Sequence, residues 1–150
     1  MKKIAAFVSL ALAALLAAML AAAPAAAQST DPDKPTTLTK GAISGTSSGA
    51  MSDEKTYYYA FDVKPGTLTL TLDVIPVNKS DGGGLVQWTL MNAKFAQLKY
   101  DNLAAQNSPE RQVKDLPVTV KRRIVMKIVV AGNINYKFKL GGSATNFPKE

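Results

Sequence analysis

TLTLTLDV, residues 67–74, alternates large apolar residues with polar ones without interruption. Successive side chains of a β-strand point to opposite faces, whereas a helix would gather neither set on one side. One face therefore carries Leu68, Leu70, Leu72 and Val74, and the other carries Thr67, Thr69, Thr71 and Asp73. The segment predicts a strand with one buried face and one exposed face.

Working outward, the same period recurs in segments divided by turn residues. Lys64-Pro65-Gly66 predicts a turn, because proline presets φ and glycine accepts positive φ. Trp88 shares a face with Val86 and Leu90, which predicts a buried side chain. Further strands are expected at residues 56–63, 85–92, 95–100, 113–120, 123–130 and 134–140. Seven or eight short strands predict an all-β chain, a single antiparallel β-sandwich of jelly-roll or immunoglobulin-like type.

The amino-terminal residues have the composition of an export signal. Two lysines precede an Ala/Leu-rich run, Pro24 interrupts it, and Ala25-Ala26-Ala27 offers a cleavage site after Ala27. The run is long enough for an uncleaved membrane anchor, but the proline and the small residues favour cleavage. We expect a signal peptide (1–27), a flexible leader that runs into an edge strand (28–40), the sandwich (41–142) and a tail (143–150).

The residue types that are absent exclude several kinds of chemistry. The 150 residues include no cysteine and no histidine, which removes disulfides, thiolate nucleophiles, Ser-His-Asp triads and histidine metal sites. We therefore expect no catalytic residue, no cofactor and no metal. The formal net charge is +7. Export argues against a nucleic-acid partner, so the basic character points to other acidic partners.

Two short motifs match enzyme motifs in sequence but lack the structural context that those motifs require. Residues 45–49 (GTSSG) fit G-x-S-x-G, which needs a strand-to-helix turn and a histidine. Ser52 and Lys55 fit S-x-x-K, which needs a helix and a desolvated lysine. Asp62 and Asp73 would lie on one sheet face if the turn between their strands paired them, as a glycosidase requires. We interpret all of these residues as solvated.

The order of the segments resembles the pre-peptidase C-terminal domain, a small bacterial β-sandwich often attached to secreted peptidases. The resemblance covers about residues 40–142 and rests on short motifs in chain order. They are Gly45, residues 59–63 (YAFDV), Pro65-Gly66, residues 67–74, residues 90–93 with Phe95, Tyr100-Asp101-Asn102, Glu110, residues 124–130 and residues 135–138 (NYKF). The resemblance implies an accessory module that binds rather than catalyses.

Some members of that family hold calcium with acidic residues before the Tyr-x-Phe motif and before the middle strand. The corresponding positions here are Lys55, Tyr57, Leu85 and Gln87, none of them acidic. Calcium requires several oxygen ligands, so the family's calcium site is not expected in this chain.

Candidate binding residues follow from exposure and charge. Tyr58 faces away from Tyr57, Tyr59 and Phe61, and is therefore the best exposed aromatic candidate, with Tyr100 next although its phase favours burial. Lys127, Lys137 and Lys139 point outward on the last two strands. If these strands pair through the short turn at Gly132-Asn133, the lysines form one basic stripe; the alternative is a solvated surface that discourages edge pairing.

These observations favour a periplasmic or extracellular bacterial protein without stable membrane insertion after signal cleavage. Its expected function is that of a non-catalytic binding or accessory module for an acidic polysaccharide or an envelope protein. Two alternatives stay open. One is a small secreted hydrolase that uses carboxylate or Ser/Lys chemistry, and the other is an assembly protein that pairs through an edge strand.

Overall fold

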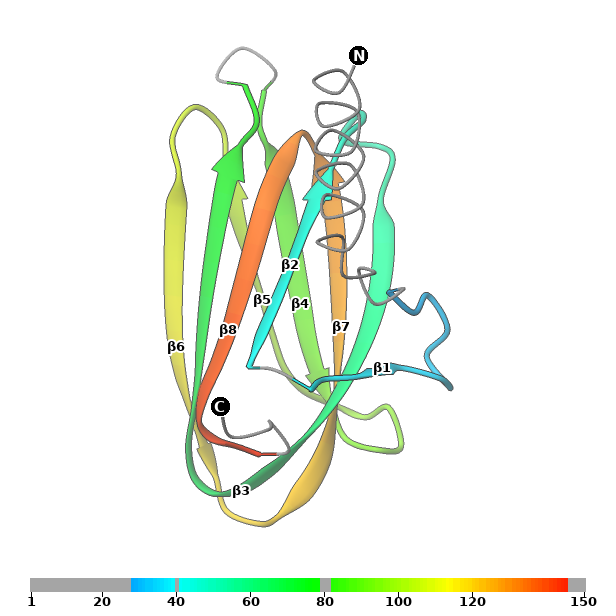
Figure 1. Cartoon of the computed structure of the whole chain (residues 1–150), viewed down its shortest axis with the longest axis vertical. Coiled ribbons are helices and arrows are strands. Elements are labelled where there is room, and N and C mark those ends of the chain that lie inside the picture. Colours follow the sequence, from blue (N-terminus) through cyan, green and yellow to red (C-terminus); the bar gives the residue numbers. More distant parts are fainter. Residues whose placement is uncertain (1–27, 40, 79–81, 146–150) are drawn as a thin grey trace, which may run out of the picture.

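The computed structural model describes residues 28–39, 41–78 and 82–145, so the predicted signal peptide lies outside the described residues. Strands account for most of this part of the chain (Figure 1). They are β1 (Thr36–Thr37), β2 (Ala42–Ser47), β3 (Lys55–Pro76), β4 (Gly84–Met91), β5 (Gln97–Ala105), β6 (Glu110–Val118), β7 (Arg122–Gly132) and β8 (Ile134–Thr145). The all-β prediction is confirmed.

β3 is one strand of 22 residues that belongs to both layers of the sandwich. Residues 55–63 pair with β7, and residues 66–76 pair with β6 and β8. The register with β8 shifts between Val63 and Leu68, and Gly66 has a φ of 142°, which suits a residue without a side chain. Figure 1 shows the resulting bend at one end of the molecule. The predicted turn at Lys64-Pro65-Gly66 is thus a corner between sheets, and its two arms are not paired with each other.

Two sheets result, and their strand order is that of a jelly roll. Sheet 1 contains β5, β4, β7 and residues 55–63, and β1 adds to it by parallel pairing. Sheet 2 contains β2, β8, residues 66–76 and β6. The first long strand, β2, pairs with the last, β8. Since the halves of β3 act as two strands, the order matches two interlocked four-stranded sheets rather than the immunoglobulin arrangement left open above.

The turn between β7 and β8 does not form a hairpin. β7 pairs with β3 and β4, whereas β8 pairs with β2 and β3. Gly132, with φ 83°, and Asn133 therefore carry the chain across from sheet 1 to sheet 2. The expectation that the last two strands pair is wrong, and so is the single basic stripe built on it.

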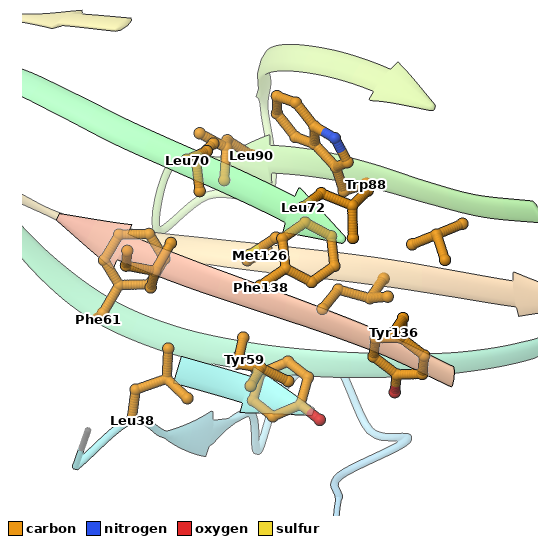
Figure 2. Packing of buried hydrophobic residues seen from close by; sticks show 14 of the residues in the cluster. Leu38, Tyr59, Phe61, Leu70, Leu72, Trp88, Leu90, Met126, Tyr136 and Phe138 are labelled. Atoms are coloured by element: carbon orange, nitrogen blue, oxygen red, sulfur yellow. The ribbon is translucent and has the colours of Figure 1, made fainter. Parts of the chain in front are cut away.

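The core lies between the sheets and consists of the side chains that the period of two places inward. Trp88 is 1% exposed, which confirms the prediction of a core tryptophan. Phe61 and Met126 from sheet 1 lie opposite Leu72 and Phe138 from sheet 2 (Figure 2). Each such side chain contributes about 1.5–3 kcal/mol by leaving water, and together these residues hold the two layers in place.

Several strands differ in extent from those expected from the sequence. β2 lies outside all of the expected strands, and β5 continues past Tyr100 to Ala105. β6 is one continuous strand across Pro117 and lies at the edge of its sheet. β1 and the buried Leu38 precede residue 41, and β8 continues to Thr145.

Candidate functional site

The register of sheet 1 aligns four outward side chains in one cross-strand row. Tyr58 of β3 is paired with Lys127 of β7, Lys127 with Thr89 of β4, and Thr89 with Tyr100 of β5. We call Tyr58, Lys127, Thr89 and Tyr100 the sheet 1 row. Neighbouring strands lie about 4.7–4.9 Å apart, so the two tyrosines stand roughly 14 Å apart at the ends of the row.

Exposure makes the row accessible to a ligand. Tyr100 is 43% exposed, contrary to the burial that its phase with Ala96 and Leu98 favoured, because its pairing with Thr89 places it on the outer face of sheet 1. Tyr58, Lys127 and Thr89 are half-buried. The backbone N–H of Tyr58 donates to the carbonyl of Ser29 (2.8 Å), so the leader fixes this end of the row.

Different residues border the row on its two sides. On one side Gln87 is paired with Asn102, which places two amide side chains beside Thr89 and Tyr100. On the other side lie Ala60, Val125 and Met91, which are buried and form a low apolar floor. The site therefore combines aromatic rings, hydroxyls, amides and one ammonium group.

The charge of Lys127 is uncompensated by any ion pair among the described residues. Asp62 is the acidic residue of β3 on this face, and its carboxylate lies 3.8 Å from the guanidinium of Arg123 rather than beside Lys127. An ammonium group surrounded by neutral side chains attracts anions more strongly than one inside a salt-bridge network.

Lys137 and Lys139 lie on the outer face of the other sheet. Lys137 is paired with Asp73 in the register, and Asp73 with Arg111 on its far side. The guanidinium of Arg111 binds both carboxylate oxygens of Asp73, at 2.5 and 3.2 Å. This hydrogen bond, aided by the charges of Arg111, Lys139 and Lys137, lowers the pKa of Asp73.

An open hollow of about 340 Å³ lies over this part of sheet 2. Its lining mixes both signs of charge with apolar groups: Asp73, Ile75, Pro109, Glu110, Arg111 and Lys137. Cations and carboxylates on this face largely neutralise one another. The structure thus brings Tyr58 and Lys127 together and separates them from Lys137 and Lys139.

The enzyme-like motifs do not assemble. Residues 45–47 of the G-x-S-x-G match belong to β2, and no helix follows them in the described part of the chain. Ser52 lies in a turn where its hydroxyl donates to Asp53 (3.4 Å). Asp62 is on sheet 1 and Asp73 on sheet 2, so the two carboxylates cannot face one bond across a cleft.

Within residues 28–39, 41–78 and 82–145, no three acidic side chains lie together in a way that could hold a metal ion. The same part of the chain contains no helix that is long and apolar enough to span a membrane.

Sequence reasoning named Tyr58 and Lys127, gave Tyr100 as the next aromatic candidate, and missed Thr89, which gave no signal. The phase of Tyr100 favoured burial because the sequence does not show that the pairing of β5 with β4 shifts between Leu90 and Met91. A bulge of this kind reverses the phase of the residues beyond it, and only the pairing reveals it.

Comparison with known proteins gives likeness in fold alone. No family model matches the chain, and no curated protein matches it. A solved pre-peptidase C-terminal domain of a collagenase from Bacillus anthracis is 15% identical, covering 75% of this chain and 100% of that one at a TM-score of 0.42. A family 35 carbohydrate-binding module from an environmental isolate is 12% identical, covering 69% and 80%, at a TM-score of 0.44.

A structure described as CBM4 is 6% identical and covers 72% of this chain and 74% of that one, at a TM-score of 0.45. These structures share the β-sandwich with this chain. The likeness concerns the fold alone, and the function has to be argued from the residues of this chain.

Proposed function

We propose that the chain is an exported, non-catalytic binding module that holds an acidic polysaccharide across the outer face of sheet 1. The observation that carries the proposal is the sheet 1 row, in which the strand register aligns two tyrosines with an uncompensated lysine between them. The extended shape of the row suits a polymer better than a small molecule.

Each type of side chain in the row has a partner group on a sugar. An aromatic ring covers the apolar C–H face of a pyranose, and hydroxyl and amide groups exchange hydrogen bonds with sugar hydroxyls. Tyr58 and Tyr100 supply rings at the two ends, while Thr89, Gln87 and Asn102 supply polar groups between and beside them. The ammonium of Lys127 at the centre would favour sugar units that carry a carboxylate.

Affinity electrophoresis of the full chain in gels containing polygalacturonate, alginate or a neutral cellulose ether tests the proposal. We expect retardation by an acidic polymer. The variant Tyr58→Ala/Tyr100→Ala should lose at least about tenfold in affinity, equivalent to about 1.4 kcal/mol, since buried aromatic contacts dominate such interfaces. No retardation by any of these polymers, or an unaffected double variant, contradicts the proposal.

The lysines provide a matched control for charge. Lys127→Gln should reduce affinity for the acidic polymer and weaken its dependence on salt, whereas Lys137→Gln/Lys139→Gln removes more charge from the other sheet and should leave affinity nearly unchanged. If the second variant has the larger effect, the ligand binds sheet 2. That result would support the lysine pair named from the sequence and overturn the sheet 1 site.

A further inference from the structure

The four edge strands of the sandwich are protected to different degrees. β1 has two residues, which is too short to template a partner. β6 carries Pro117 and charged residues along its length. β5 carries Lys99 and Asp101, and its Asn102 carbonyl accepts a hydrogen bond from the side chain of Gln112 (3.1 Å). Short length, proline, charge and covering side chains are the usual means by which edges avoid pairing.

β2 lacks two of these protections, charge and proline. Its sequence, AISGTS, contains no charged residue and no proline. It pairs with β8 along one side and is the last strand of sheet 2. Ala42, Ser44 and Thr46 are exposed, and all three side chains are small. The edge is therefore neutral and flat.

The hydrogen-bond phase shows which backbone groups this edge offers. The N–H of Leu140 donates to the carbonyl of Gly41 (2.8 Å), so residues 41, 43 and 45 direct their polar groups toward β8. Ala42, Ser44 and Thr46 direct theirs away from β8. The side chain of Gln28 donates a hydrogen bond to the Ser44 carbonyl at 3.5 Å, which is the outer limit for such a bond, so a partner strand at this edge displaces only this long contact.

We propose that β2 pairs antiparallel with β2 of a second copy of this chain, about a two-fold axis at Ser44. Ser44 then lies opposite Ser44 of the second copy, and Ala42 lies opposite Thr46. All three outward-directed residues exchange both of their backbone hydrogen bonds, and sheet 2 becomes continuous across the dimer.

Side chains on both faces fit this pairing. On the inner face Ile43 lies opposite Gly45 of the second copy. The ring of Tyr136 occupies the space beside this glycine, because a Cβ atom at residue 45 would lie 2.5 Å from the Tyr136 hydroxyl. On the outer face Lys137 is one strand from Ser44, so the two copies of Lys137 stand three strand spacings, about 14 Å, apart. This exceeds the Debye length of about 8 Å in physiological salt.

A single-cysteine experiment tests the register, because the chain contains no cysteine of its own. Residues opposite each other in a hydrogen-bonded antiparallel pair lie about 5.5 Å apart between Cα atoms, within the range that a disulfide spans. The variant Ser44→Cys should therefore form a disulfide-linked dimer on mild oxidation. Thr46→Cys is the matched control. In the proposed register the two copies of residue 46 are offset by four residues along the strands, so their thiols would be about 13 Å apart.

We expect the Ser44→Cys dimer to form at least about tenfold faster than the Thr46→Cys dimer. Equal rates indicate random collision, and no cross-linking of either variant indicates that the edges do not meet; both results overturn the proposal. Both substitutions are at exposed positions, and far-ultraviolet circular dichroism verifies that the variants are folded.

Sedimentation of the wild-type chain over a concentration series provides a second measurement. We expect a monomer–dimer equilibrium that Ser44→Pro abolishes, because proline removes an N–H that faces away from β8 and so spares the pairing within the chain. A wild type that stays monomeric throughout contradicts the proposal. Tyr58→Ala/Tyr100→Ala should dimerise normally, which keeps this test separate from that of the polysaccharide site.

Discussion

The two open sides of the sandwich are closed by different kinds of contact. On the side of β5 and β6, polar side chains bridge the two sheets, whereas on the side of β1 and β2 the sheets meet through apolar and aromatic groups. Figure 2 shows Trp88 toward one side of the core and Leu38, Tyr59 and Tyr136 toward the other.

The β5/β6 side contains a chain of satisfied hydrogen bonds. The indole N–H of Trp88 donates to the side-chain oxygen of Gln112 (3.1 Å), and the side-chain nitrogen of Gln112 donates to the carbonyl of Asn102. Next to them the ammonium of Lys114 lies 2.8 Å from a carboxylate oxygen of Asp101. Every bridging group there has its partner on the opposite sheet or strand.

The β1/β2 side has the opposite character. Leu38 fills the gap between the sheets, and the hydroxyl of Tyr59 is buried with no hydrogen-bond partner among the described residues. Burial raises the pKa of Tyr136 to about 12 and raises that of Tyr59 further. The β5/β6 side thus depends on polar complementarity and the β1/β2 side mainly on burial, so mutation and pH should affect them differently.

The largest expected effect is on the apolar side. Leu38→Ala should lower the free energy of unfolding by about 2–4 kcal/mol, because Leu38 is only 6% exposed and its removal leaves a cavity under β1. Chemical denaturation measures the loss. The matched control is Leu98→Ala on β5, which is 38% exposed and should cost less than about 1 kcal/mol. Equal losses would mean that the leader does not close this side.

A smaller loss is expected on the polar side. Gln112→Leu should cost about 1–3 kcal/mol, because it leaves the buried indole N–H of Trp88 without an acceptor. Denaturation again provides the measurement, with the exposed Val113→Ala as control. Trp88 fluorescence should shift in the variant as well; an unchanged spectrum and stability would show that the hydrogen bond does not contribute.

Acid should weaken the polar side. The hydrogen bond from Lys114, with a further one from the Asn102 backbone, lowers the pKa of Asp101. A carboxylate with a depressed pKa stabilises the fold above its unfolded pKa, near 3.9, and loses that contribution as the pH falls through its folded value. Stability should therefore decline below about pH 4, and less steeply in Asp101→Asn. Asp73 contributes in the same direction, so the variant keeps part of the slope.

The smallest effect is a gain. Tyr59→Phe removes a buried hydroxyl that has no partner among the described residues, and should leave stability unchanged or raise it by up to about 1 kcal/mol. Tyr58→Phe, at the half-buried site on sheet 1, is the control and should be neutral. A loss of more than about 1 kcal/mol in Tyr59→Phe would show that the hydroxyl has a partner in solution.

The strands that the sequence predicted best are those whose alternation is local. Leu68, Leu70, Leu72 and Val74 are all buried, as the period of two requires. β2 escaped prediction because Ile43 is its only large apolar residue, so it shows no alternation. A residue pattern over a few positions can report a strand's faces but not its partners.

Pairing explains the other errors. Gly132-Asn133 and Pro65-Gly66 are typical of tight turns, yet each carries the chain from one sheet to the other, and turn residues do not distinguish these two uses. The same limit applies to the site. Tyr58 and Lys127 were chosen separately for exposure and charge, and only the register of β3, β7, β4 and β5 makes them neighbours of each other and of Tyr100.

The position of β3 has a consequence for the chain during its synthesis. Its main partners, β6, β7 and β8, all follow it in sequence. A nascent chain therefore presents 22 residues of strand, with one apolar face, before any of these partners has left the ribosome. Unpaired strands of this kind aggregate readily. The interval before β8 emerges is when a holding chaperone would matter most to this protein.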